Sequence, residues 1–565
     1  MKGNNAGARR LAICGLLLVA MLGTSAQAQW LRAESQNVVV YSDSDEKRVR
    51  AFVQKLERFH ALLALRMPGR TPDVVAPLTV YLVRNRRDLM RAVPGAHHSL
   101  GGMYVPSASG VRAIAVAEHA DRREDDDVLL KSYTRHFMSQ RYPQGGPIWI
   151  IRGFSEYFGT ADVEGQRITV GEPSRWRAYQ LMADYDNWID FEEILNGSVW
   201  ERDSDQVSLA YAQSWLLTHY LLASNERWAA AQEVFAALRN GESVVKAFEQ
   251  HLGLDMRALR AELRLYAGRQ IRFSVLDVEF PEVPVSITSL SEAADRVMLP
   301  NIAIELGARD GDTLARVREA FARHPTDPFA VECRARAEAA AGDPQRALDL
   351  LAPLLAGTDA RAEHHYLAGM AQLSLAARAL KAPDAITADA NAARVAAANH
   401  FARAIQADDT DYRSLYRYWQ IRIGNGDAPD MRLQDVLVQA YNLAPQVQEI
   451  ALSTGVMLLS VKRIVEARVV LNKLAGDPHG ESASRTARRL VTVIDALPTG
   501  REPTNREIAD AMAQAAGGSS ADTGDDASDT AEPEPEPAPE PAKPATNERT
   551  HLTPGAHSRT VAARG

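Results

Sequence analysis

The chain has very little cysteine: only Cys14 and Cys333 occur among its 565 residues. Cys14 lies in a short apolar run, LAICGLLLVAMLG, which follows an Arg pair and leads to the small residues from Ser25 to Ala28. This order is typical of a secretory signal that is cut after Ala28, so we expect a periplasmic or secreted protein. Cleavage would leave Cys333 alone, which excludes an intrachain disulfide and a thiolate metal site.

Basic tracts and long hydrophobic runs are also absent. The net charge is -8 and the pI is near 6.0. Neither value indicates a nucleic acid as partner, and the sequence has no stretch in which basic and aromatic residues alternate. The first apolar run is shorter than the roughly 20 residues that span a bilayer, although a membrane anchor is the alternative to a signal. Later segments are less apolar, so we expect no membrane attachment after cleavage.

Short apolar runs and helical spacing predict an α+β domain over residues 29–276. After Trp30, a strand, a helix, a strand and a short helix are expected, and a hairpin of two strands follows. Two helices separated by a Pro/Gly-rich turn come next, then a hairpin that turns at Glu164-Gly165, and then a helical region. The expected ranges are 37–43, 44–67, 78–83, 86–93, 101–118, 128–159, 158–170 and 176–276.

Beyond a linker at 277–290, residues 291–516 are rich in Ala and show a period. Apolar residues four positions apart recur in similar surroundings, and the last three of these pairs are about 34–36 residues apart. The first gap is longer because residues 376–394 resemble an insertion. The pairs are Ala347/Leu351, Ala397/Phe401, Leu433/Leu437 and Ala467/Leu471. This period resembles that of tetratricopeptide repeats, although a helical bundle without repeats is the alternative.

The last segment, 517–565, loses its apolar content and becomes acidic and rich in proline. Such a composition cannot bury enough surface to fold, so we expect a disordered tail with a stiff, extended section at 532–544.

The stretch 128–159, VLLKSYTRHFMSQRYPQGGPIWIIRGFSEYFG, has the layout of a zinc-peptidase active site. In such a site, two His of an H-E-x-x-H helix and a Glu of the next helix bind zinc, and the Glu of the motif takes a proton from the bound water. The segments SYTRHF and WIIRGFSEYF resemble the cores of the peptidase MA-like family. In the second core, the matching residues are Trp149, Gly153, Glu156, Tyr157 and Phe158. The resemblance covers about residues 30–270 and implies a zincin-like fold.

The departures from this family fall on the functional positions. Lys131 and Arg135 stand at the two His positions, Ser132 at the position of the base, and Arg152 at that of the third ligand. A guanidinium has no lone pair for a metal. The resemblance therefore implies a pseudo-peptidase with no catalytic residue, no metal and no cofactor.

Two alternatives stay open at this site. A divergent zinc metallopeptidase could use relocated ligands. The candidates are His136, His97-His98 and Glu118-His119, and packing or surface roles fit them better. Lys131, Arg135 and Arg152 could instead converge on a carboxylate or phosphate, since Arg binds planar anions through two hydrogen bonds. Internal neutralisation, with Glu156 four residues after Arg152, is the competing interpretation.

The sequence thus predicts an exported, non-catalytic scaffold that binds protein or peptide partners through its helical repeats. A polysaccharide or cell-wall binder has little support, because most Trp and Tyr residues lie at helical core spacing.

Overall fold

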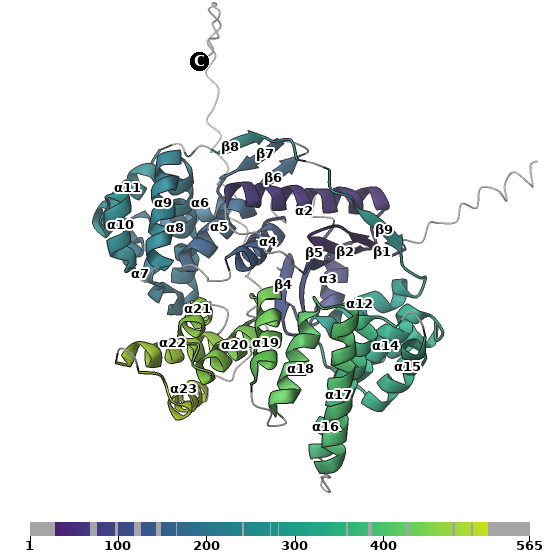
Figure 1. The fold of residues 1–565 in the computed structure, drawn as a ribbon. Coiled ribbons are helices and arrows are strands. Elements are labelled where there is room, and N and C mark those ends of the chain that lie inside the picture. The colour runs from purple at the N-terminus through teal and green to yellow at the C-terminus, as the bar shows by residue number, and fades with distance from the viewer. Residues whose placement is uncertain are drawn as a thin grey trace, which may run out of the picture.

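The structure is a computed structural model, and it describes residues 29–517 except for 68–75, 97–99, 118–125, 143–147, 165–166, 240–241, 270, 272, 281, 358–359, 382–386, 425–428, 477–480 and 499–500. The expected signal peptide and all but the first residue of the expected tail therefore lie outside the described residues. A small mixed sheet with helices around it is followed by a long series of helices, so the α+β class is confirmed (Figure 1).

The first part of the chain is built on a six-stranded sheet with the order β4-β5-β3-β2-β1-β9. Its β2–β3 and β3–β5 pairs are parallel, and the other pairs are antiparallel. The strands are β1 (Leu31–Glu34), β2 (Val38–Ser42), β3 (Leu78–Val83), β4 (Gly102–Ser107), β5 (Gly110–Val116) and β9 (Ser286–Ser289).

Side chains alternate along each strand, so this sheet has apolar residues on both faces, and helices cover both. Val80 and Leu82 of β3 pack with the apolar stripe of α2 (Glu46–Arg66), while Tyr81 and Val83 face the other way. On that second face lie α3 (Arg86–Ala92) and α12 (Ala294–Glu305), the first helix beyond the expected linker.

The remaining elements of the first part of the chain are mainly helical. Two of them, α4 (Asp126–Arg141) and α5 (Ile148–Gly159), are the expected helix pair. The others are β6 (Asp162–Glu164), β7 (Arg167–Val170), α6 (Arg175–Ala183), α7 (Phe191–Asn196), α8 (Ser204–Leu222), α9 (Asn225–Arg239), α10 (Val244–Leu252), α11 (Met256–Ala267) and β8 (Ser274–Asp277). Strands β6, β7 and β8 form a second, antiparallel sheet.

The segment expected to be a linker, 277–290, contributes a strand to the main sheet. Its strand β9 pairs with β1 and forms one edge of the main sheet. Just before β9, residues 282–285 cross α2, where Gln54 donates a hydrogen bond to the Val283 carbonyl over 2.7 Å. The sequence did not predict this strand, because four residues are too few to show the alternation of a strand. The prolines and the absence of a helical period indicated a linker instead.

The second part of the chain is a series of helices that curves beneath the main sheet and α2 in the view of Figure 1. The helices after α12 are α13 (Gly311–Ala322), α14 (Pro328–Ala341), α15 (Pro344–Ala356), α16 (Ala362–Lys381), α17 (Thr387–Ala407), α18 (Tyr412–Gly424), α19 (Met431–Leu443), α20 (Gln448–Ser460), α21 (Ile464–Ala475), α22 (Glu481–Ala496) and α23 (Asn505–Gly517).

The periodic apolar pairs fall on successive odd-numbered helices of this series. Ala347 and Leu351 lie in α15, and the later pairs lie in α17, α19 and α21. All eight side chains are buried, with at most 5% exposure. The expected insertion at 376–394 includes the end of α16 and the beginning of α17. These two helices are longer than their neighbours. The period in the sequence therefore records how consecutive helices pack.

Buried ion pairs join the two parts of the molecule. Glu305 of α12 accepts a hydrogen bond from Arg112 of β5 over 2.7 Å, and its other oxygen lies 3.2 Å from Arg336 of α14. Arg336 also pairs with Glu363 of α16 at 2.9 Å, and Glu363 pairs with Arg413 of α18 at 2.8 Å. Alternating charges thus run from the central sheet through four helices of the second part.

Candidate functional site

The residues at the expected metal positions lie on α4 and α5, which pack against each other. Lys131, Ser132 and Arg152 are buried, with 7%, 3% and 2% exposure, and Arg135 is partly buried. Gly153 allows α5 to approach α8 closely, because a Cβ at this position would lie 2.1 Å from Thr218 Oγ1 and 2.5 Å from the Ser214 carbonyl oxygen. The site is therefore enclosed between packed helices.

The carboxylate of Glu156 holds two of the basic side chains in this region. Its Oε2 lies 3.1 Å from Lys131 Nζ. Arg177 of α6 donates two hydrogen bonds to the same carboxylate, from Nε over 3.0 Å and from Nη2 over 2.9 Å. This fork geometry is the strongest form of an Arg–carboxylate pair. Glu156, which has 2% exposure, thus compensates positive charge that is buried with it.

Tyr211 of α8 lies close to two guanidinium groups. Arg152 Cζ and Arg177 Cζ are each 5.0 Å from the centre of its ring. At this distance the electron-rich face of an aromatic ring attracts a cation. Arg177 is fixed further through hydrogen bonds from Nη1 to Gln180 Oε1 over 3.0 Å and to Ser208 Oγ over 3.1 Å. We call Lys131, Arg152, Glu156, Arg177 and Tyr211 the cationic cluster.

Arg135 has a different hydrogen-bond partner from the other basic residues at the expected site. Its Nη2 donates a hydrogen bond to Ser132 Oγ over 3.3 Å, three residues back along α4. The structure therefore brings Lys131 and Arg152 together within the cationic cluster and places Arg135 beside Ser132, the residue at the expected position of the base. Neither a guanidinium nor an ammonium group at these positions can ligate a metal in its charged form.

His136 lies next to Arg135 in the sequence but belongs to another set of contacts. It is 4% exposed, and its Nδ1 lies 3.1 Å from the hydroxyl of Tyr104 on β4. Burial, with a smaller contribution from the nearby His60, lowers the pKa of His136 to about 3. A neutral histidine that hydrogen-bonds a tyrosine on the sheet fits the expected packing role.

Other candidate ligands cannot be placed. His97-His98 and Glu118-His119 lie outside the described residues. Within the described ranges, His, Cys, Asp and Glu side chains form no group of three or more that could hold a metal ion. In the same part of the chain, none of the helices combines the length and apolar character that crossing a membrane requires.

Sequence reasoning missed Arg177, Tyr211 and the polar residues that hold Arg177. Arg177 and Gln180 both have at most 8% exposure, although they belong to a helix with exposed Tyr179 and Met182. The sequence gives one signal of this arrangement. Arg177 and Gln180 are three positions apart and so share one face of the helix, while the apolar Tyr179 and Met182 lie elsewhere on it.

Comparisons with known proteins add no relative: no family model, no curated protein and no solved structure matches the chain.

Proposed function

We propose that this chain is an exported, non-catalytic scaffold: a zincin-like domain of the peptidase MA-like type without a working metal site, followed by tetratricopeptide-like helices that bind protein or peptide partners. One observation carries the proposal: Glu156 is buried and held by Lys131 and Arg177 at the junction of α4 and α5. The residue that resembles a family carboxylate is thus engaged by cations of the fold itself.

The electrostatics of the cationic cluster support a structural role. A divalent cation at this junction would lie near Lys131 and Arg152, and like charges repel strongly where water is scarce. Burying a charge is costly unless it is paired, and the Glu156 carboxylate supplies that pairing for Lys131 and Arg177. Internal neutralisation therefore fits this geometry better than a vacant site for an external anion.

Partner binding rests on the second part of the chain. Series of packed helices present extended surfaces that suit proteins and peptides. Part of that surface is already used within the molecule, since Lys473 of α21 donates a hydrogen bond to the Ser139 carbonyl of α4 over 3.1 Å. Partner contacts are therefore expected on helix faces turned away from the first domain.

Zinc content tests the proposal directly. We expect elemental analysis of the full chain, purified without chelator, to find far less than one zinc per molecule. The alternative, a divergent metallopeptidase with relocated ligands, requires about one zinc per chain. Zinc that a chelator removes, with loss of thermal stability or of proteolytic activity, would contradict the proposal.

The anion alternative has a separate test. We expect thermal shifts in phosphate and in dicarboxylates to be the same for the natural chain and for Arg135→Ala. This variant removes the least buried of the three basic residues and leaves the Glu156 pairs in place. A stabilisation by anions that disappears in Arg135→Ala would show that the site takes an anion.

A further inference from the structure

Helix α2 carries a basic surface although the chain as a whole is acidic. Six of its basic residues are exposed or half-buried, whereas Glu46 is its only exposed acidic residue. The other acid of the helix, Glu57, is buried and accepts hydrogen bonds from Ser35 and Asn37. The six basic residues are Lys47, Arg48, Arg50, Lys55, Arg58 and Arg66. With a net charge of -8 for the chain, this concentration of positive charge is local.

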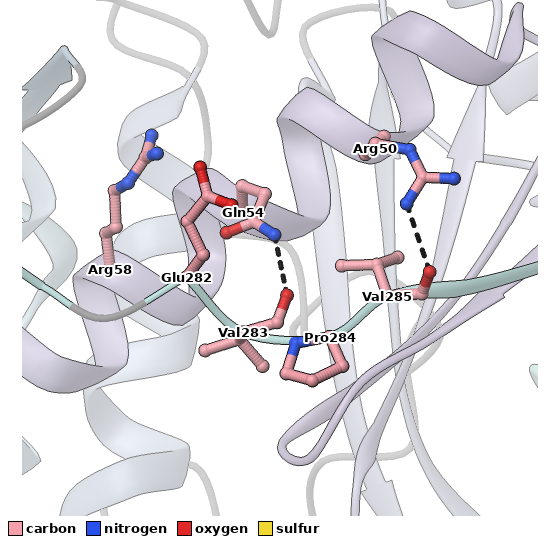
Figure 2. A pocket seen from close by; sticks show the side chains of 7 residues that line it. All are labelled: Arg50, Gln54, Arg58, Glu282, Val283, Pro284 and Val285. Atoms are coloured by element: carbon pink, nitrogen blue, oxygen red, sulfur yellow. Dashed lines mark hydrogen bonds between the residues drawn. The ribbon is translucent and has the colours of Figure 1, made fainter.

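A groove of about 410 Å³ lies on this surface, between α2 and residues 282–285. Figure 2 shows how the crossing segment is held: Arg50 Nη1 donates to the Val285 carbonyl over 3.0 Å and Gln54 Nε2 to the Val283 carbonyl over 2.7 Å. Arg58 lines the groove one helical turn beyond Gln54, and Glu282 supplies its one acidic side chain. The groove is therefore bounded by the main chain of Val283 and Val285 and by Arg50, which also pairs with Glu46 over 2.8 Å, and Arg58 lines it further along the helix.

The chain contains a segment of opposite charge. Residues 522–540 include eight Asp and Glu and no Lys or Arg. Four of these acids, Glu532, Glu534, Glu536 and Glu540, alternate mostly with proline. A proline-rich strand binds with a smaller loss of conformational entropy than a flexible one, because its backbone is already restricted.

The spacing of the two sets of charges agrees. An extended, proline-rich chain rises about 3.1 Å per residue, so four residues of such a chain, the interval from Glu532 to Glu536, would span about 12 Å. Arg50 and Arg58 are eight residues apart on a helix that rises about 1.5 Å per residue, which also gives about 12 Å. Fourteen residues, 518–531, lie between the end of α23 and Glu532, and an extended connection of this length spans at most about 50 Å.

We propose that the groove between α2 and residues 282–285 binds the acidic, proline-rich segment 532–540 of the same molecule, with Arg50 and Arg58 facing its carboxylates. The segment would cover the basic surface of α2 and cross the connection between the two parts of the chain. This role does not depend on whether the cationic cluster is catalytic.

The test measures binding of a fluorescent peptide with the sequence of residues 529–544 by anisotropy. The receptor is the full chain with Glu532, Glu534, Glu536 and Glu540 changed to Gln, so that its own segment does not compete. Arg50→Gln and Arg58→Gln should each weaken binding about two- to fivefold, the range of exposed ion pairs. Arg506→Gln, at a side chain that is 91% exposed on α23, is the matched control and should bind like the receptor.

Two further arms complete the test. The natural chain should bind the peptide more weakly than the receptor, because its own segment occupies the groove. A peptide with Gln in place of Glu should not bind, and salt should weaken the binding of the natural peptide. Equal binding by the receptor and its Arg50→Gln and Arg58→Gln variants, or by the natural chain and the receptor, would overturn the proposal.

Discussion

The carboxylate of Glu156 is enclosed by α4, α5 and α6 and faces the charges of Lys131 and Arg177. Removing it would leave two cations buried with reduced compensation. Breaking a buried ion pair by removing one partner typically costs about 3–5 kcal/mol. We therefore expect Glu156→Gln to lower the free energy of unfolding by about this amount, as measured by urea denaturation.

A matched control separates this effect from a general loss of charge. Glu233 of α9 is exposed, and Glu233→Gln should change stability by about 0.5 kcal/mol or less. If Glu156→Gln were as stable as the natural chain, the pairing would not hold the fold, and a functional reason for this carboxylate would have to be sought.

The candidate site was only partly predictable from the sequence. The motif comparison located Lys131, Ser132, Arg135 and Arg152, because their neighbours in the sequence match a known pattern. It could not find Arg177, which is 21 residues from Glu156 and reaches it only after α6 has packed against α8. Local patterns record faces of single elements, whereas a buried ion pair depends on the packing of several.

At the scale of elements, the close approach of α5 and α8 depends on Gly153. An added methyl group would overlap Thr218 and the main chain of Ser214, and the helices would have to separate. Overpacking of this kind costs about 1–3 kcal/mol. We expect Gly153→Ala to destabilise the chain by about this amount in thermal or urea unfolding.

Gly424 provides the comparison, since no atom lies within 4 Å of a Cβ built there. Gly424→Ala should therefore be neutral or slightly stabilising, because alanine restricts the unfolded chain. Similar losses in both variants would mean that helix–helix contact at Gly153 is not the cause.

Most elements were predictable because their apolar periods are long. The strand at 78–83 and the helix at 44–67 agree closely with β3 and α2. Asp45 begins α2 by accepting a hydrogen bond from the Arg48 amide, a signal that the sequence also contains. The short strand β9 was hidden, since its pairing with β1 joins residues about 255 positions apart. Such pairing leaves no local trace.

At the scale of the whole molecule, Glu305 links the central sheet to the helical series. Burial by itself would raise its pKa, but Arg112 and Arg336 outweigh this effect and lower the pKa to about 2. The neighbouring Arg336 is itself shared with Glu363. The connection between the two parts is therefore charged and closed to water, so they should unfold together at neutral pH.

Acid should weaken this connection in a defined pH range. A carboxylate whose pKa falls on folding stabilises the folded state above its unfolded pKa, here about 4.5, and this contribution disappears as the pH falls toward about 2. The shift corresponds to roughly 3 kcal/mol.

We expect Glu305→Gln to be less stable than the natural chain by about 3 kcal/mol at neutral pH, with a difference that shrinks below about pH 4.5. Urea unfolding as a function of pH measures this difference, and the exposed Glu292→Gln is the control. A stability difference for Glu305→Gln that stays constant down to about pH 3 would show that the amide disturbs packing and that the charge of Glu305 does not join the two parts.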